Sequence, residues 1–98
     1  MEHYTYIMEF RGGTYITQVA AINIADSVFK WIEQIEHEVV EIKHIGNKTI
    51  LELKQLYLNN LIDKPIRLNR LFNVWCLGVY CKVGTMKINI VNTKTNLD

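Results

Sequence analysis

The sequence predicts an α+β fold in which an antiparallel sheet, built from an N-terminal and a C-terminal β-hairpin, packs against one or two helices. Three observations lead to this prediction. Residues 4–19 alternate around two adjacent glycines, residues 23–38 repeat with helical spacing, and residues 72–91 alternate again. The length of 98 residues fits one hydrophobic core, so we expect a single small α+β domain over residues 1–98 with a frayed polar tail over residues 92–98.

The N-terminal hairpin is expected to turn at Gly12 and Gly13. Both central positions of a type I′ turn have positive φ, which glycine adopts without a steric penalty. This turn pairs Phe10 with Tyr15 and gathers the large side chains of both strands on one face. A phosphate-binding loop is the competing interpretation, but such a loop leads into a helix N-terminus, whereas a β-branched run follows here. We therefore assign the two glycines a structural role in the turn.

The clearest helix covers residues 23–38. Asn23 is a good N-cap, and Asp26 places negative charge in the first turn, where the helix dipole favours it. Apolar residues recur every three or four positions and fall on one side of the helix, which is therefore expected to face the core: Ile24, Ala25, Val28, Phe29, Trp31, Ile32 and Ile35.

Residues 39–45 have the pattern of a short strand, and residues 46–47 that of a turn. The following residues 49–61 allow two interpretations. A Thr-x-x-Glu capping box that ends at Glu52, together with a helical apolar pattern, favours a second helix. A hairpin across residues 46–47 also alternates correctly, but it places Glu41 opposite Glu52, and like charges across a strand pair are unfavourable. We predict the helix.

The C-terminal third returns to alternation and predicts a second hairpin with a turn near residues 83–84. One face of this hairpin is strongly apolar and consists of Trp75, Leu77, Val79, Cys81, Met86, Ile88 and Ile90. The other face is mixed, so we expect another part of the protein or a partner to cover some of it; it consists of Val74, Cys76, Tyr80, Lys82, Lys87, Asn89 and Val91.

Composition narrows the classes of partner. Hydrophobic residues make up 49% of the chain and charged residues 21%, which is typical of an ordinary globular protein. The net charge of +1 is far from the basic balance of a nucleic-acid-binding domain, so we do not expect nucleic acid as the partner. The N-terminus lacks the apolar segment of a secretory signal, and no stretch approaches about 20 apolar residues, so we expect a cytoplasmic protein without a membrane segment.

The sequence contains no set of residues with catalytic or metal-binding spacing. Cys76 and Cys81 lie five residues apart on a predicted strand, so their side chains point to opposite faces and cannot share one ion. The histidines His3, His37 and His44 lie in three separate segments. We therefore expect no metal, no cofactor and no catalytic residue, and we expect both cysteines to be free thiols in a reducing compartment.

Basic side chains are candidates for interaction. Lys64, Arg67 and Arg70 are spaced by three in a predicted loop or edge segment, a pattern that suits a phosphate or an acidic partner as well as ordinary solubility. Arg11, beside the glycines, is likewise a candidate for binding a phosphate or an acidic partner. A local surface ion pair with Glu9 is the simpler explanation for this residue.

Tyr15 is the remaining candidate for interaction, because it shares a predicted face with Tyr4 and Tyr6. A platform for stacking nucleotides would need basic residues interleaved on the same face, and that face has none. We therefore expect the rings to pack under the first helix with their hydroxyls at the rim. If the helix covers only the second hairpin, the same rings form an exposed apolar patch and imply a protein partner.

These observations predict a non-catalytic, intracellular binding or regulatory module of the antitoxin, immunity-protein or adaptor type that self-associates. The prediction rests on the lack of a catalytic pattern and on apolar sheet surface that one certain helix cannot cover, which leaves room for a second subunit or another protein. Two alternatives remain open. One is a small enzyme whose site assembles from Glu9, Arg11, His44 and Cys76. The other is a nucleic-acid-binding domain that uses Lys64, Arg67, Arg70 and the tyrosines.

Overall fold

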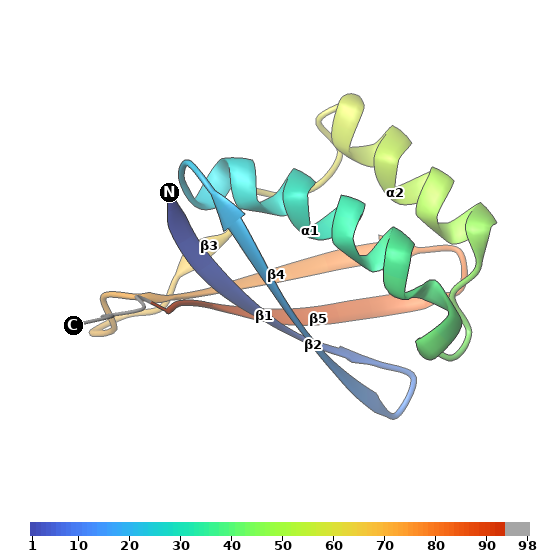
Figure 1. Cartoon of the computed structure of the whole chain (residues 1–98), viewed down its shortest axis with the longest axis horizontal. Helices are drawn as coiled ribbons and strands as arrows, with labels where there is room; N and C mark the ends of the chain where they lie inside the picture. Colours follow the sequence, from blue (N-terminus) through green and yellow to red (C-terminus); the bar gives the residue numbers. More distant parts are fainter. Residues whose placement is uncertain (94–98) are drawn as a thin grey trace.

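The computed structural model describes residues 1–93 and contains a five-stranded antiparallel sheet with both helices on one face (Figure 1). The strand order is β2-β1-β5-β4-β3, so the two hairpins meet along β1 and β5 in the interior of the sheet. This arrangement confirms the predicted α+β fold. The elements in chain order are β1 (Glu2–Phe10), β2 (Gly13–Ala21), α1 (Ile24–Glu38), a 3₁₀ helix (Val39–Glu41), α2 (Asn47–Leu58), β3 (Ile66–Arg67), β4 (Val74–Cys81) and β5 (Gly84–Asn92).

The turn of the N-terminal hairpin lies one residue earlier than predicted. Phe10 pairs with Gly13, so the two loop residues are Arg11 and Gly12, with φ of 47° and 84°. Positive φ at both positions is the geometry of a type I′ turn, but a non-glycine residue occupies the first of them. Each cross-strand partner shifts by two residues relative to the prediction, and Tyr15 pairs with Met8. Because strand side chains alternate with period two, this shift leaves the predicted faces unchanged.

The start of α1 matches the prediction in detail. The side-chain oxygen of Asn23 accepts a hydrogen bond from the backbone N–H of Asp26 at 2.8 Å. The Asp26 carboxylate in turn accepts from the backbone N–H of Ile22 at 3.0 Å. One N–H group that the first helical turn leaves free is therefore satisfied by the N-cap side chain, and the Asp26 carboxylate ties the residue just before the cap to the helix, which stabilises its start.

The strand predicted over residues 39–45 is wrong. The chain instead continues from α1 into the 3₁₀ helix, and two side chains of the connection, Ile42 and Ile45, are buried in the core at 5% and 6% exposure. His44 has a φ of 69°, which reverses the chain toward α2. The β-branched residues of this segment therefore anchor a helix-to-helix connection rather than a strand. The segment meets the edge strand β2 through a side chain, the Tyr15 hydroxyl, which accepts from the Lys43 backbone N–H.

The helix predicted over residues 49–61 is confirmed as α2, and the alternative hairpin is wrong. The helix starts two residues earlier than predicted, and its N-cap is Gly46, which has no side chain to cap it. Glu52 does not close a capping box; its carboxylate accepts from the backbone N–H of Lys82 at 3.1 Å and so joins α2 to the β4–β5 turn. Among residues 1–93, neither helix has the length and apolar character needed to cross a membrane.

The C-terminal hairpin is confirmed, with Trp75, Leu77 and Val79 opposite Ile90, Ile88 and Met86. Its loop consists of Lys82 and Val83, beside the predicted position. The frayed tail predicted over residues 92–98 is wrong for its first two residues, because Asn92 ends β5 and the Thr93 backbone N–H donates to the His3 carbonyl at 2.8 Å. Residues 94–98 lie outside the described part of the chain.

The core lies between the sheet and the two helices. The ring of Tyr6 stacks on Trp31 with a centroid distance of 5.3 Å and an interplanar angle of 13°. The Tyr6 hydroxyl bonds the Ser27 hydroxyl at 2.7 Å. Tyr4 is equally buried and meets Trp75 edge to face at 6.0 Å. The stacking on Trp31 confirms that the Tyr6 ring packs under α1, but its hydroxyl is buried against Ser27 and does not lie at the rim as predicted.

Candidate functional site

The face of the sheet that points away from the helices is not covered by any segment within residues 1–93 (Figure 1). We call it the open sheet face. Its side chains follow from the strand registers, because residues that alternate with the buried ones point to the opposite side. They are His3, Thr5, Ile7 and Glu9 of β1; Thr14, Ile16, Gln18 and Ala20 of β2; Ile66 of β3; Val74, Cys76, Gly78 and Tyr80 of β4; and Thr85, Lys87, Asn89 and Val91 of β5.

Large apolar side chains on the open sheet face lie in solvent. Ile16 is 65% exposed, Ile66 is 66% exposed and Tyr80 is 72% exposed. Ile7 pairs with Ile16 in the β1–β2 register, so the two side chains lie next to each other on this face. Apolar groups of this size spread over one whole side of a small protein are typical of a surface that another molecule covers.

A shallow hollow of about 460 Å³ lies in the open sheet face beside Gly78. Gly78 contributes no side chain, and the nearest side-chain atom to its missing Cβ position is the Tyr80 hydroxyl oxygen at 3.7 Å. Charges of both signs surround the hollow. Glu9 and Lys87 are cross-strand partners, and Asp63 and Lys64 lie together at the rim. The hollow therefore combines an apolar floor with balanced charge.

Two of the predicted interaction residues lie at the N-terminal hairpin, where the contacts are structural. An Arg11 Nη1 group donates to the Val83 carbonyl at 3.5 Å and so bridges the turns of the two hairpins. The Tyr15 hydroxyl accepts from the Lys43 backbone N–H at 3.3 Å, on the helix side of the sheet. The predicted ion pair between Arg11 and Glu9 is not among the ion pairs of the described residues.

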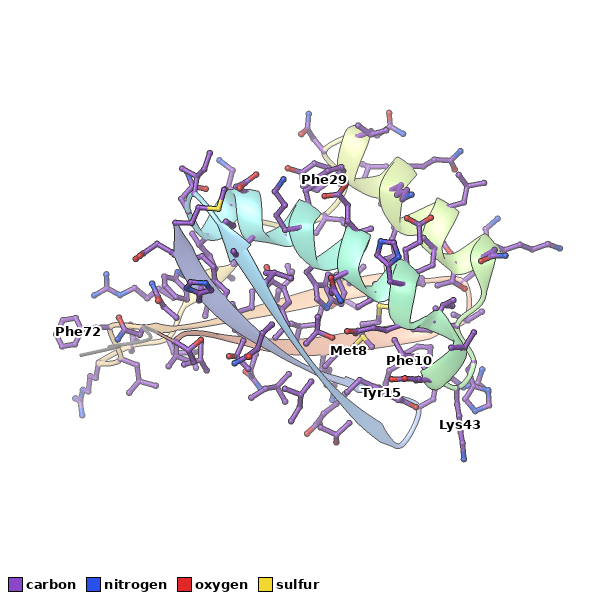
Figure 2. All side chains as sticks on the ribbon, viewed as in Figure 1. Met8, Phe10, Tyr15, Phe29, Lys43 and Phe72 are labelled. Carbon is purple, nitrogen blue, oxygen red and sulfur yellow. The ribbon has the colours of Figure 1, made fainter. Side chains whose placement is uncertain are left out.

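The structure separates the predicted basic cluster. Arg67, the last residue of β3, is held against the loop that follows it: its Nε donates to the Leu71 carbonyl at 3.3 Å, and its guanidinium lies 5.5 Å from the centre of the Phe72 ring. Phe72 projects from the end of the molecule opposite to Tyr15 and Lys43 (Figure 2). Arg70 is exposed in the following turn, and Lys64 lines the hollow. Of the three, only Lys64 is part of the open sheet face and its rim.

The four residues of the enzyme alternative fall into different surroundings. Glu9 and Cys76 both line the hollow beside Gly78. Arg11 lies with Glu9 in a second hollow of about 420 Å³ next to the hairpin turn. His44 is exposed in the connection between the helices. The structure thus brings Glu9 and Cys76 to one hollow, while His44 does not line it.

Cys81 faces the helix side, opposite to Cys76, as the spacing predicted. Burial raises the pKa of the Cys81 thiol to about 11, and the nearby Glu52 carboxylate adds to the increase. Cys81 is therefore a protonated, packed thiol at neutral pH. Within residues 1–93, no group of three or more His, Cys, Asp or Glu side chains is arranged to hold a metal ion.

Sequence reasoning missed Ile7, Ile16 and Ile66 as surface residues of interest. Ile7 and Ile16 stand at alternating positions opposite the buried ones, so their face could have been derived from the hairpin pattern. Their exposure could not have been derived in this way, because it depends on both helices packing against the same side of the sheet.

Comparison with known proteins adds nothing to the site: no family model fits the chain, and no curated protein or solved structure matches it.

Proposed function

We propose that this chain is a non-catalytic protein-binding module of the antitoxin, immunity-protein or adaptor type, that it self-associates, and that its open sheet face holds the partner protein. The single observation that supports this most strongly is the one-sided helix layer. Both helices cover one face of the sheet, whereas Ile16, Ile66 and Tyr80 are each more than half exposed on the other. Leaving such side chains in water is unfavourable by roughly 1.5–3 kcal/mol for each one that a partner would bury.

The charges on this face define the chemistry of the partner. Glu9 with Lys87, and Asp63 with Lys64, place an acidic and a basic group side by side at the hollow. A nucleic acid would meet a carboxylate beside each of these lysines, which weakens phosphate binding. A folded protein with an apolar patch flanked by one acidic and one basic side chain complements the face instead.

Site-specific photo-crosslinking tests this proposal. The photoreactive phenylalanine analogue p-benzoylphenylalanine replaces either Tyr80 on the open sheet face or Leu58 on α2, which are 72% and 73% exposed. Both variants are expressed in the source organism, irradiated, and their adducts identified by mass spectrometry. We expect position 80 to give an adduct with one partner protein and position 58 to give none.

The identified partner is then purified and titrated against the chain. We expect Ile66→Lys to weaken this binding at least tenfold and Leu58→Lys to leave it unchanged, because only the first residue lies on the open sheet face. Equal adducts from both positions, or no adduct at position 80, would overturn the proposed function. Adducts formed only between two copies of the chain would overturn the choice of a different protein as the occupant of this face.

A further inference from the structure

The outer edge of β2 has unpaired backbone groups within the described residues. β2 is the first strand in the sheet order, so only one of its sides is bonded, to β1 (Figure 1). The two-residue loop makes Phe10 and Gly13 a hydrogen-bonded pair, and such pairs recur at every second residue. The N–H and C=O groups that point outward therefore belong to Thr14, Ile16, Gln18 and Ala20.

This edge lacks the features that normally prevent strand addition. Edge strands are usually shortened, bulged, or protected by charged residues and proline. β2 instead pairs with β1 over nine residues without a break in register, and its four outward residues are exposed, uncharged and not proline. The opposite edge, β3, has only two residues and carries Arg67. The sheet is thus protected at one edge and open at the other.

Space for an added strand lies alongside β2. A groove of about 340 Å³ separates Gln18 and Ala20 from the flank of α1 that carries Lys30, Glu33 and His37. The helix therefore does not close over the edge at this end. An extended segment placed here would gain backbone hydrogen bonds from β2 and polar contacts from α1.

We propose that a second copy of this chain adds its own β2, antiparallel, to the outer edge of β2, with the two-fold axis at Ile16. This deepens the self-association part of the proposed function and rests on it, but it uses the strand edge rather than the open sheet face. The five-stranded sheets of the two copies then form one continuous ten-stranded sheet. Ile16 then lies against the second copy's Ile16, and Thr14 lies against the second copy's Gln18.

The side chains of the edge are self-complementary in this register. Ile16 is already the neighbour of Ile7 on β1, so the two copies create an apolar band of four isoleucines across the joint. The flanking pairs of Thr14 with Gln18 join two uncharged polar residues. No charged side chain meets a like charge along this edge of the sheet, because its outward residues carry none.

Charges on the helix side select the register. The Thr17 hydroxyl donates to the Glu38 carboxylate at 2.6 Å, and the Tyr15 hydroxyl lies at the Lys43 backbone (Figure 2). With the axis at Ile16, Thr17 lies beside the second copy's Tyr15, so Glu38 approaches the segment that carries Lys43. An axis at Thr17 would instead bring the two Glu38 carboxylates together, which is unfavourable.

Sedimentation equilibrium of the full chain tests the association with a matched pair of variants. Ile16 and Ile66 are 65% and 66% exposed and lie at opposite edges of the sheet. We expect the wild type and Ile66→Lys to form dimers of equal strength. Ile16→Lys should weaken the dimer at least 100-fold, because it places two ammonium groups on the axis, while its thermal unfolding shows that the monomer still folds. A strictly monomeric wild type, or an Ile16→Lys dimer as strong as wild type, would overturn the inference.

Disulfide trapping tests the register. In a background with Cys76→Ser and Cys81→Val, Ile16→Cys places two cysteines about 5.5 Å apart between Cα atoms, within reach of a disulfide. Ala20→Cys is the control, since the two copies of this residue lie about 27 Å apart along the strands. We expect oxidation to link Ile16→Cys into a covalent dimer and to leave Ala20→Cys monomeric. Linkage at position 20 and not at position 16 would overturn the proposed axis. The result of disulfide trapping is independent of the photo-crosslinking test at Tyr80. The dimer and the proposed protein-binding function can therefore be refuted separately.

Discussion

The ring of Tyr15 lies across Gly13 at the start of β2 and occupies the space that a side chain would need there. A Cβ atom placed on Gly13 would come within 2.5 Å of the Tyr15 hydroxyl oxygen and 2.7 Å of the adjacent ring carbon. The ring is kept in this position because its hydroxyl accepts a hydrogen bond from the Lys43 backbone N–H. Glycine is therefore needed at position 13 because the Tyr15 ring fills the space of a side chain. At position 12 it is needed because the backbone has a φ of 84°.

Gly13→Ala is expected to destabilise the protein by about 1 kcal/mol, because the Tyr15 ring must move and lose its bond to Lys43. In a Tyr15→Ala background the same substitution should instead stabilise by about 0.4–1 kcal/mol, since alanine restricts the unfolded chain. Urea unfolding of the four proteins of this double-mutant cycle measures both values. A Gly13→Ala effect of the same sign and size in both backgrounds would contradict the contact.

Arg11→Asn is expected to stabilise the protein. Arg11 has a φ of 47° at the first position of the type I′ turn, where an ordinary side chain is strained and asparagine is favoured. The gain should be about 0.5 kcal/mol in the free energy of unfolding, after the weak bond to Val83 is lost. Arg11→Ala is the control, because it removes the same bond without favouring positive φ. If asparagine proves no better than alanine, the turn assignment is wrong.

The buried bond between Tyr6 and Ser27 predicts unequal effects of removing either partner. The Ser27 hydroxyl donates to the Ile24 carbonyl at 2.6 Å, so Tyr6 must be the donor to Ser27. Ser27→Ala leaves the buried Tyr6 hydroxyl without an acceptor and should cost about 1–3 kcal/mol. Tyr6→Phe removes that hydroxyl and should cost less, about 0.5–1.5 kcal/mol. Thermal unfolding measures both, and a larger loss for Tyr6→Phe would reverse the assignment of donor and acceptor.

The raised pKa of Cys81 predicts a loss of stability at alkaline pH. In the unfolded chain the thiol releases its proton near its ordinary pKa of 9.0, whereas the folded protein retains it up to a pKa of about 11. Between these values the unfolded state binds fewer protons, so the free energy of unfolding falls as pH rises and levels off above the folded pKa.

Cys81→Val isolates this contribution, because the tyrosines and lysines that also titrate are present in both proteins. The difference in unfolding free energy between wild type and Cys81→Val should be constant below about pH 9 and shift in favour of the variant up to about pH 11. Urea unfolding across this range measures the difference. Parallel stability curves would show that Cys81 ionises equally in both states.

Both hairpins and both helices were predictable because each depends on a local pattern. The alternation around Phe10 and around Leu77 marks strands whichever elements they pair with, and Asn23 with Asp26 marks a helix start by itself. The position of the first turn was not predictable to the residue. The adjacent Gly12 and Gly13 allow two placements that keep the same faces, and the alternation of the strands does not distinguish between them.

The connection after α1 and the candidate site depend on tertiary structure and so could not be predicted. Ile42 and Ile45 have strand-forming neighbours, yet they are buried in the core from a helix-to-helix connection that contacts β2 through the Tyr15 side chain and not through strand pairing. Likewise, Ile16 is a surface residue only because β2 is an edge strand and α1 packs on its other face. Strand order and the side on which helices pack are set by contacts between distant segments, which periodicity does not record.

The pairing of β1 with β5 has a consequence for synthesis on the ribosome. Tyr4 pairs with Asn92 at the end of β5, so one side of β1 finds its partner only after both helices and β4 have been synthesised. Until then the nascent β1 is itself an edge, and the hairpin it forms with β2 lacks half of the sheet beneath α1. Pairing of β1 with β5 is thus a late step in forming the described sheet, and folding is expected to be slower than in a helical protein of this size.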